Sequence, residues 1–514
     1  MRTLLCSFLA LSACAPSSST STPSAAPTAG LEAKEGLFSV YLDRKGGRVL
    51  ARFPEPDAAS GESLRVVYVA SLGAGMGSNP VGLDRGRTAP PVILAFRVVG
   101  NRLLAVAENH RFVAHSADPL ERKAVRESFA ESVLWAGEIL SSNDPGILVD
   151  LSGFIARDAV GIAPRLKSAG QGVFKLDAKR SLVDPTGTLV FPDNVETEAL
   201  LTFSSDAPGD EVVSTTPVPN AMTLRVHHSF VRLPDSQYQA RLADPRISSV
   251  PYPIRDYAAG LDEPIEKRLV VRHRLELSAD GSVKKPIVFY VDRGAPEPVR
   301  SALVEGARWW TEAFEAAGFP GGYKVEILPE GAHPLDARYN VIQWAHRETR
   351  GWSYGNPIID PRTGEIIKGI VTLGSLRLRQ DRMIFEGLLG AQNTGSGRPD
   401  DPVQLALARV RQLSAHEVGH CLGFLHNMAA SSNDRASVMD YPAPWIRPRT
   451  DGTLDVTKAY SVGIGAWDKL AVKYSYAPTP PGQEEARFLD SIAAQGKALG
   501  LNYVVDPHAR GLGA

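Results

Sequence analysis

The residues best suited to chemistry lie in the last quarter of the chain: His416, Glu417, His420, Gly423 and His426. Two histidines four residues apart lie on one face of a helix, so both imidazoles can bind one zinc ion. Gly423 can take the positive φ that ends a helix and brings His426 back as a third ligand. Three neutral imidazoles leave one coordination position open, as a catalytic zinc requires, and the neighbouring Glu417 can accept a proton from water. We therefore predict a catalytic zinc centre.

A helix must carry the first two histidines, and the residues before them can form one. Asp400 or Asp401 can cap its N-terminus, and Pro402 suits its first turn. Its apolar side would consist of Leu405, Leu407, Val410 and Leu413.

The string HEVGHCLGFLH of residues 416–426 matches the metzincin signature HExxHxxGxxH at every fixed position. Residues 437–441 (SVMDY) resemble the methionine turn of the same proteins. By this resemblance, Met439 forms an apolar floor beneath the imidazoles. Tyr441 is similar to the tyrosine of the astacin and serralysin branches, which binds zinc at rest and then moves to the oxyanion.

Together with GWSYGNPIIDPRTGEIIKG at residues 351–369, this string resembles a family of bacterial envelope zinc-dependent metalloproteases. In that family a β-rich domain of unknown function precedes a metzincin domain, and the likeness covers most of residues 36–476. The resemblance implies a zinc endopeptidase with Glu417 as general base and a protein or peptide substrate. Substrate would lie along one strand of the hairpin at residues 353–373, and Trp445 would line a specificity pocket.

A second hypothesis comes from another class of protein. The chain would be an envelope binding or scaffold lipoprotein whose zinc site is catalytically inert. The large β-rich domain favours this reading, whereas the intact Glu417 opposes it. A third possibility is that the β-rich domain is an inhibitory pro-segment. No cysteine lies between residues 15 and 420, so a thiol from that stretch cannot cap the zinc, but a carboxylate can.

The elements that position the site indicate an α+β protein. Short β-branched runs between residues 37 and 279 predict a β-rich N-terminal domain, interrupted by one helix near residues 120–140. His227 and His228 are adjacent on a strand, so they point to opposite faces and cannot share a metal. From residue 286 strands and helices alternate, with a helix at 297–317, and this pattern predicts a metzincin-like α/β catalytic domain with an active-site helix. His346, in the strand before the hairpin, is read as structural.

The predicted domains follow from these changes of pattern. They are a signal peptide at 1–13, a lipid anchor and flexible tether at 14–35, the β-rich domain at 36–283, the zinc peptidase domain at 284–478 and a C-terminal tail with a helix at 479–514.

The N-terminal residues predict export. Arg2 and the apolar residues 4–11 form a short signal peptide, and residues 11–14 (LSAC) resemble a bacterial lipobox that would leave Cys14 lipidated. Residues 15–30 are rich in Ser, Thr, Pro and Ala and form a tether. We expect a location in the bacterial cell envelope, lipid-anchored at the outer membrane or in the periplasm. An ordinary cleaved signal, and hence secretion, is the alternative.

Charge excludes other classes of partner. The 514 residues include 56 basic and 57 acidic residues, so the net charge of -1 offers no surface for nucleic acid or for anionic lipids. Any membrane contact is therefore expected only through the lipid anchor. After loss of Cys6 and lipidation of Cys14, Cys421 is the remaining thiol, and we expect it to be a small buried apolar side chain.

Overall fold

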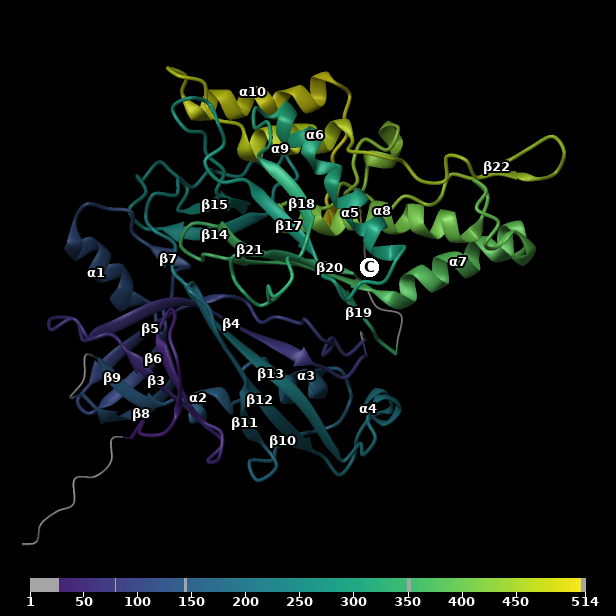
Figure 1. Cartoon of the computed structure of the whole chain (residues 1–514). Coiled ribbons are helices and arrows are strands. Elements are labelled where there is room, and N and C mark those ends of the chain that lie inside the picture. Colours follow the sequence, from purple (N-terminus) through teal and green to yellow (C-terminus); the bar gives the residue numbers. More distant parts are fainter. Residues whose placement is uncertain (1–26, 79, 143–145, 349–352, 510–514) are drawn as a thin grey trace, which may run out of the picture.

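The computed structural model describes residues 27–78, 80–142, 146–348 and 353–509. The predicted signal peptide and the lipidation site at Cys14 lie outside the described residues. Within the described ranges, no helix combines the length and apolar character needed to cross a membrane. The chain folds into a β-rich part, purple through blue to dark teal in Figure 1, and a part with helices packed on a second sheet, teal through green to yellow. This arrangement confirms the α+β class.

The β-rich part is built on a twelve-stranded antiparallel sheet in which the neighbours run β1-β2-β3-β9-β8-β6-β5-β4-β13-β12-β10, with β11 also pairing with β12. In chain order the strands are β1 Glu32–Lys34, β2 Ser39–Asp43, β3 Arg48–Phe53, β4 Glu62–Ala74, β5 Val92–Val99, β6 Arg102–Ala107, β8 Ser132–Ser141, β9 Ile147–Asp150, β10 Lys175–Leu176, β11 Leu182–Val190, β12 Asn194–Ser204 and β13 Ala221–Arg232.

Aromatic residues from strands that are far apart in the order of this sheet meet in one core, so the sheet curls on itself. The ring of Phe38, just before β2, lies 5.7 Å from the ring of Phe230 in β13 and 5.0 Å from that of Phe53. Phe154, in a short helix, is fully buried against Phe230. The helices of this part are α1 Pro119–Ser128, α2 Ser152–Ile155, α3 Ile162–Ser168 and α4 Asp210–Thr215, and a small sheet is formed by β7 Phe112–Val113, β14 Pro251–Asp256 and β15 Glu266–Val270.

The second part has a six-stranded sheet with the order β16-β21-β19-β17-β18, and β20 pairs with β21. Its elements are β16 Arg272–His273, β17 Ile287–Val291, α5 Val299–Arg308, α6 Trp310–Ala316, β18 Tyr323–Ile327, β19 Asn340–Ala345, β20 Tyr354–Ile359, β21 Glu365–Gly374, α7 Ser375–Leu389, α8 Pro402–Cys421, α9 Ala466–Tyr476, α10 Glu485–Ala498 and α11 Asp506–Ala509. Two 3₁₀ turns, Ala391–Asn393 and Ala430–Asn433, and a two-stranded ribbon of β22 Arg447–Pro448 and β23 Leu454–Asp455 complete it.

The second sheet is parallel except for one strand. Strands β16, β17, β18, β19 and β21 pair in parallel, whereas β20 pairs antiparallel with β21, from Tyr354 opposite Thr372 to Ile358 opposite Lys368. The predicted hairpin is therefore confirmed. Among the described residues β20 pairs with no other strand, so it forms an edge of the sheet, and it packs against α8.

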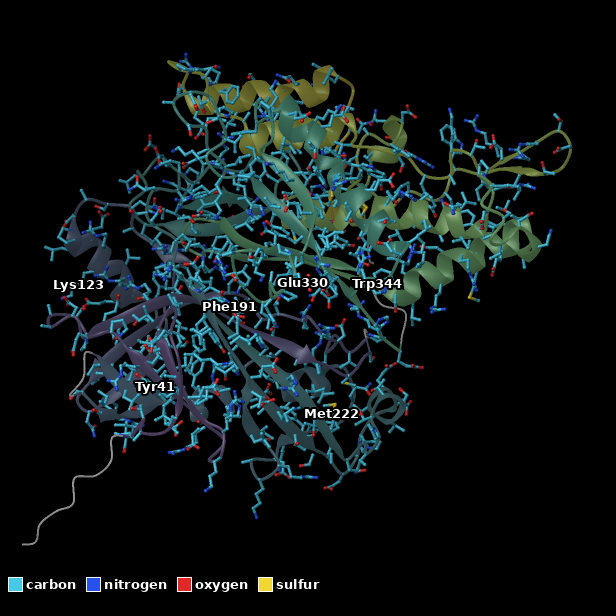
Figure 2. All side chains as sticks on the ribbon, in the orientation of Figure 1. Tyr41, Lys123, Phe191, Met222, Glu330 and Trp344 are labelled. Atoms are coloured by element: carbon cyan, nitrogen blue, oxygen red, sulfur yellow. The ribbon has the colours of Figure 1, made fainter. Side chains whose placement is uncertain are left out.

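The two parts pack face to face. One face of the second sheet carries helices α5, α6, α8 and α9, and the β-rich part lies on the other side (Figure 1). At this junction Val67, Val69 and Val231 of the large sheet contact Ile358 and neighbouring residues of the hairpin. Side chains fill the junction in Figure 2, where Phe191 is labelled, and its ring lies 6.0 Å from that of His333.

Two predicted helices differ from those observed. The helix expected over residues 297–317 is divided at Trp309, whose N–H bonds the carbonyl of Gly306 and so tightens the turn, while Trp310 Nε1 donates to the carbonyl of Ala415 in α8. The helix expected near residues 120–140 is the shorter α1, and residues 132–141 form β8, because their backbone pairs with that of β6.

Candidate metal centre

Helix α8 carries the first two histidines and is anchored at its start. The Asp401 side chain accepts hydrogen bonds from the N–H of Val403 (2.9 Å) and of Gly397 (2.8 Å), so Asp401 is the cap. Asp400 instead pairs with Arg398. The helix then runs through the core to Cys421, and most of its side chains are buried. This packing fixes the position of its last turns, which carry His416 and Glu417.

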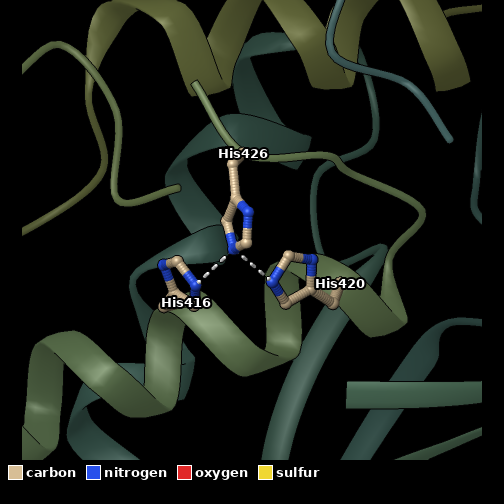
Figure 3. A group of neighbouring side chains, drawn as sticks. All are labelled: His416, His420 and His426. Atoms are coloured by element: carbon tan, nitrogen blue, oxygen red, sulfur yellow. Dashed lines mark hydrogen bonds between the residues drawn. The ribbon is translucent and has the colours of Figure 1, made fainter. Parts of the chain in front are cut away.

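Three imidazoles converge just beyond this helix (Figure 3). The Nε2 atom of His426 lies 3.2 Å from Nε2 of His416 and 3.1 Å from Nε2 of His420. Donor atoms of all three lie within 4.8 Å of one another. Ligand nitrogens of a tetrahedral zinc at about 2.0 to 2.1 Å are roughly 3.3 Å apart. The three histidines therefore fit a zinc ion, and they are the residues that the sequence predicted.

The second nitrogen of each ring fixes its orientation. Nδ1 of His416 lies 2.8 Å from the carbonyl of Val438, and Nδ1 of His420 lies 2.8 Å from the carbonyl of Phe424. A carbonyl oxygen only accepts, so each Nδ1 carries the proton and each Nε2 presents a lone pair. Burial lowers the pKa of His416 well below its usual value and that of His420 to about 4, so both rings are neutral, as metal ligands must be.

Gly423 turns the chain so that His426 can reach the other two rings. Its φ is +93°, and an added Cβ would overlap the carbonyl oxygen of Val271. The strand-like residues 248–250 hold the turn from outside: the N–H of Leu425 donates to Ser248 (2.6 Å) and that of Val250 to Gly423 (2.7 Å). Only glycine fits both the conformation and this close approach.

Met439 lies under the end of α8. Its side chain is 1% exposed, and a Cβ at Gly419 would overlap the sulfur. The turn around it is tied down by Asp468, a buried carboxylate of α9 that accepts hydrogen bonds from Ser437 Oγ (2.5 Å) and the N–H of Val438 (2.9 Å). Since the carbonyl of Val438 orients His416, this turn and the first ligand form one rigid unit.

Glu417 and Tyr441 flank the histidines. The Glu417 side chain is buried, and burial raises the pKa of its carboxyl to about 8, while the charge of Arg409 and the backbone N–H of Gly355 in β20 oppose that rise. A cation held by the three imidazoles would further favour the charged carboxylate. The hydroxyl of Tyr441 lies 2.8 Å from His426 Nε2, so it points to the place where the ring nitrogens meet.

Other residues singled out in the sequence lie apart from the centre. His227 contacts Glu196 and Glu198, whereas His228 contacts Tyr68 and the carbonyl of Ile155 on the opposite face, as predicted for strand neighbours. Cys421 is fully buried. His346 is exposed and contacts Ser375.

Trp445 lies between two arginines. Its ring lies 4.1 Å from the guanidinium of Arg447 and 5.6 Å from that of Arg435, and it lines a surface cavity of about 650 Å³. The residues around this cavity do not include the three histidines. A role for Trp445 in substrate specificity stays a prediction.

One residue at the centre was missed from the sequence. Both carboxylate oxygens of Asp506 lie 2.9 Å from Nδ1 of His426. The two residues are eighty positions apart, and the sequence has no fixed spacing that would connect them. The carboxylate accepts from Nδ1–H, so His426 also presents a lone pair on Nε2.

Fold and site together thus define a domain in which two histidines of a helix and a third beyond a glycine turn could hold a metal ion, above a turn that contains Met439. Residues 398–513 match the Met-zincin family model, and residues 86–278 match the model described as Domain of unknown function (DUF5117). Neither the curated proteins nor the solved structures gave a match. The chain therefore combines a DUF5117 domain with a Met-zincin domain, which confirms the predicted pairing. The Met-zincin match includes α8, the three histidines and the segment that carries Asp506.

Proposed function

We propose that the protein is a zinc-dependent endopeptidase. The observation that carries the proposal is the convergence of three Nε2 lone pairs beside a buried carboxylate, in a domain matched by the Met-zincin family. A zinc ion in such a site lowers the pKa of water and polarises a peptide carbonyl. The family implies a protein or peptide as substrate.

Three residues of the chain would carry out the other steps of the reaction or support the site. Glu417 accepts a proton from the attacking water and passes it to the leaving amine. The hydroxyl of Tyr441 donates to the carbonyl oxygen as negative charge develops there. Met439 keeps the floor of the site apolar and supports the end of α8.

Strand β20 supplies a place for the substrate backbone. As an edge strand packed against α8, it can pair with an extended peptide through main-chain hydrogen bonds. Gly355 in this strand lies beside Glu417, so a peptide paired here would pass the catalytic carboxylate. Specificity would then come from side-chain pockets along the strand.

The test compares the wild type with Glu417→Gln and with Glu330→Gln, a matched change at an exposed glutamate outside the site. Cleavage of a denatured protein mixture should fall by about 10²-fold or more in Glu417→Gln, remain normal in Glu330→Gln and stop when a chelator removes the metal. Zinc content should be unchanged in both variants. Equal cleavage by the wild type, Glu417→Gln and chelated protein would support the inert scaffold instead.

Export and lipid anchoring are a separate proposal that rests on the N-terminal sequence. Cys14 would carry the lipid, and the mature protein would fractionate with membranes of the bacterial envelope. Cys14→Ser should abolish incorporation of labelled fatty acid and release the protein from the membrane fraction. Incorporation in the variant equal to that in the wild type would contradict the assignment.

A further inference from the structure

We propose that Asp506 is a positioning residue for the third metal ligand and that the segment 500–506 is a clasp that holds it there. This inference rests on the proposed zinc centre and deepens it. The contact is direct, because both Asp506 oxygens lie 2.9 Å from Nδ1 of His426.

His426 needs such a partner more than the other two ligands do. His416 and His420 stand on α8, and their Nδ1 atoms donate to backbone carbonyls of Val438 and Phe424 in the same compact unit. His426 stands outside the helix, after the Gly423 turn, and within the part of the chain that the structure describes its Nδ1 contacts the Asp506 carboxylate rather than a backbone carbonyl. Rotation of its ring is therefore limited by Asp506.

A carboxylate also differs from a carbonyl in charge. A hydrogen bond to a carboxylate is stronger than one to a neutral carbonyl, and such a partner makes a histidine a better metal ligand. Asp506 thus does more than orient the ring: it strengthens Nε2 of His426 as a donor to a cation.

The clasp is held by hydrogen bonds to the residues that directly follow His426. Asn427, next to His426, is fully buried, and its side chain donates to the carbonyl of Asn502 (2.9 Å) and accepts from the N–H of Val504 (3.2 Å). The N–H of Met428 donates to the carbonyl of Val504 (2.8 Å). These bonds tie the residues just after the third ligand to those just before Asp506.

A second fastening lies farther from the metal centre. The Asn433 side chain donates to the carbonyl of Gly500 (2.7 Å) and accepts from the N–H of Asn502 (3.0 Å). The ring of Tyr503 stacks on Trp467 of α9, with centroids 5.1 Å apart. Asn433 contacts none of the three histidines, so it offers a way to loosen the clasp without touching the ligands.

The first experiment measures the zinc dissociation constant of the full chain by competition with a chelator. Asp506→Ala should weaken zinc binding about 10- to 100-fold, Asp506→Asn should weaken it less, and Asp506→Glu should restore part of the affinity. The control is Asp490→Ala, an exposed aspartate of α10 paired with Arg246. Unfolding of the metal-free proteins shows whether each variant is folded.

A spectroscopic measurement separates positioning from general loss of structure. With Co²⁺ in place of zinc, the visible absorption bands of Asp506→Ala should shift, because the His426 ring takes a new orientation, whereas Asp490→Ala should keep the wild-type spectrum. Wild-type affinity and spectrum in Asp506→Ala would overturn the proposal. These readouts do not require peptidase activity, so the proposal can fail while the proposed function stands.

The clasp itself is tested by Asn433→Ala and by the double variant with Asp506→Ala. If Asn433 acts through Asp506, Asn433→Ala alone weakens zinc binding, and the double variant is no weaker than Asp506→Ala. Effects that multiply in the double variant would overturn the role of the segment 500–506 as a clasp.

Discussion

At the scale of single residues, each nitrogen of the three imidazoles has a defined role. Nδ1 is held by an acceptor and Nε2 faces the common centre, so these hydrogen bonds orient all three rings toward one shared cation. Such preorganisation lowers the cost of ordering ligands around the metal. Tyr441 belongs to the same arrangement, since its hydroxyl reaches His426 Nε2.

Tyr441→Phe should reduce kcat by about 10²-fold, because one donor to the developing oxyanion is lost. KM should change little and zinc content should be unchanged, since three histidines still hold the metal. Steady-state kinetics with a peptide substrate measure both constants. Tyr257→Phe, a change at a half-exposed tyrosine of the β-rich part, serves as the control. An unchanged kcat in Tyr441→Phe would remove this residue from the mechanism.

A second residue-scale prediction concerns His227 in the β-rich part. Burial disfavours its charged form, but Glu196 and Glu198, which contact its two ring nitrogens, outweigh burial and raise its pKa to about 9. Because the folded pKa exceeds the unfolded value of about 6.5, the stabilisation is complete below that pH and is lost as pH rises through about 9. It amounts to on the order of 3 kcal/mol.

The measurement is urea unfolding of the wild type and His227→Gln between pH 6 and 10. The difference in unfolding free energy should be largest at pH 6 and should shrink toward pH 10. A difference that stays constant across this range would show that His227 is neutral in the folded protein.

At the scale of elements, the turn after α8 brings the third histidine to the two that the helix carries. The helix alone presents His416 and His420, and Gly423 redirects the chain so that residues 424–426 run back past the helix end. The bonds of Leu425 and Val250 then fix this course against residues 248–250. Ligand geometry thus depends on one backbone conformation.

Gly423→Ala should abolish zinc retention, because the positive φ is strained for alanine and the new Cβ would overlap the Val271 carbonyl. The displaced turn moves His426 away from the other rings. Elemental analysis of the purified protein measures the zinc. Gly452→Ala is the matched control: its φ is +80°, but no atom lies within 4 Å of the added Cβ. Full zinc occupancy in Gly423→Ala would contradict the argument.

At the scale of the whole molecule, the β-rich part contacts β20, the edge strand of the second sheet. Asp84 pairs with Arg347 at 2.6 Å, and both side chains are at least 97% buried. The hydroxyl of Tyr354, the first residue of β20, donates to the same carboxylate (3.0 Å) and lies near the carbonyl of Arg85 (3.1 Å). One loop of the β-rich part therefore fixes the start of the strand proposed to bind substrate.

Asp84→Ala should lower the unfolding free energy by about 3 to 5 kcal/mol, because it removes the buried ion pair between Asp84 and Arg347. Denaturant unfolding measures the loss, and hydrogen exchange of residues 354–359 should rise with it. The control is Asp193→Ala, which removes the exposed pair with Arg232 and should cost less than about 1 kcal/mol. A loss as small as that of the control would mean that the junction depends on apolar contacts alone.

Much of the centre could be predicted from the sequence because its spacing is local. Helix periodicity places His416 and His420 on one face, and the capping aspartate, the glycine turn and the edge hairpin all involve neighbours in the chain. The same holds for His227 and His228, since alternation along a strand does not depend on the rest of the fold.

Only the tertiary structure decided which distant segments complete the site. Asp506 reaches His426 from eighty residues away, Asp468 holds the turn before Met439, and Asp84 joins the β-rich part to β20. The division of the helix at Trp309 has the same origin, because Trp310 bonds a carbonyl of α8. Local pattern determines which face a side chain takes, whereas its partner across the fold is set by how the layers pack.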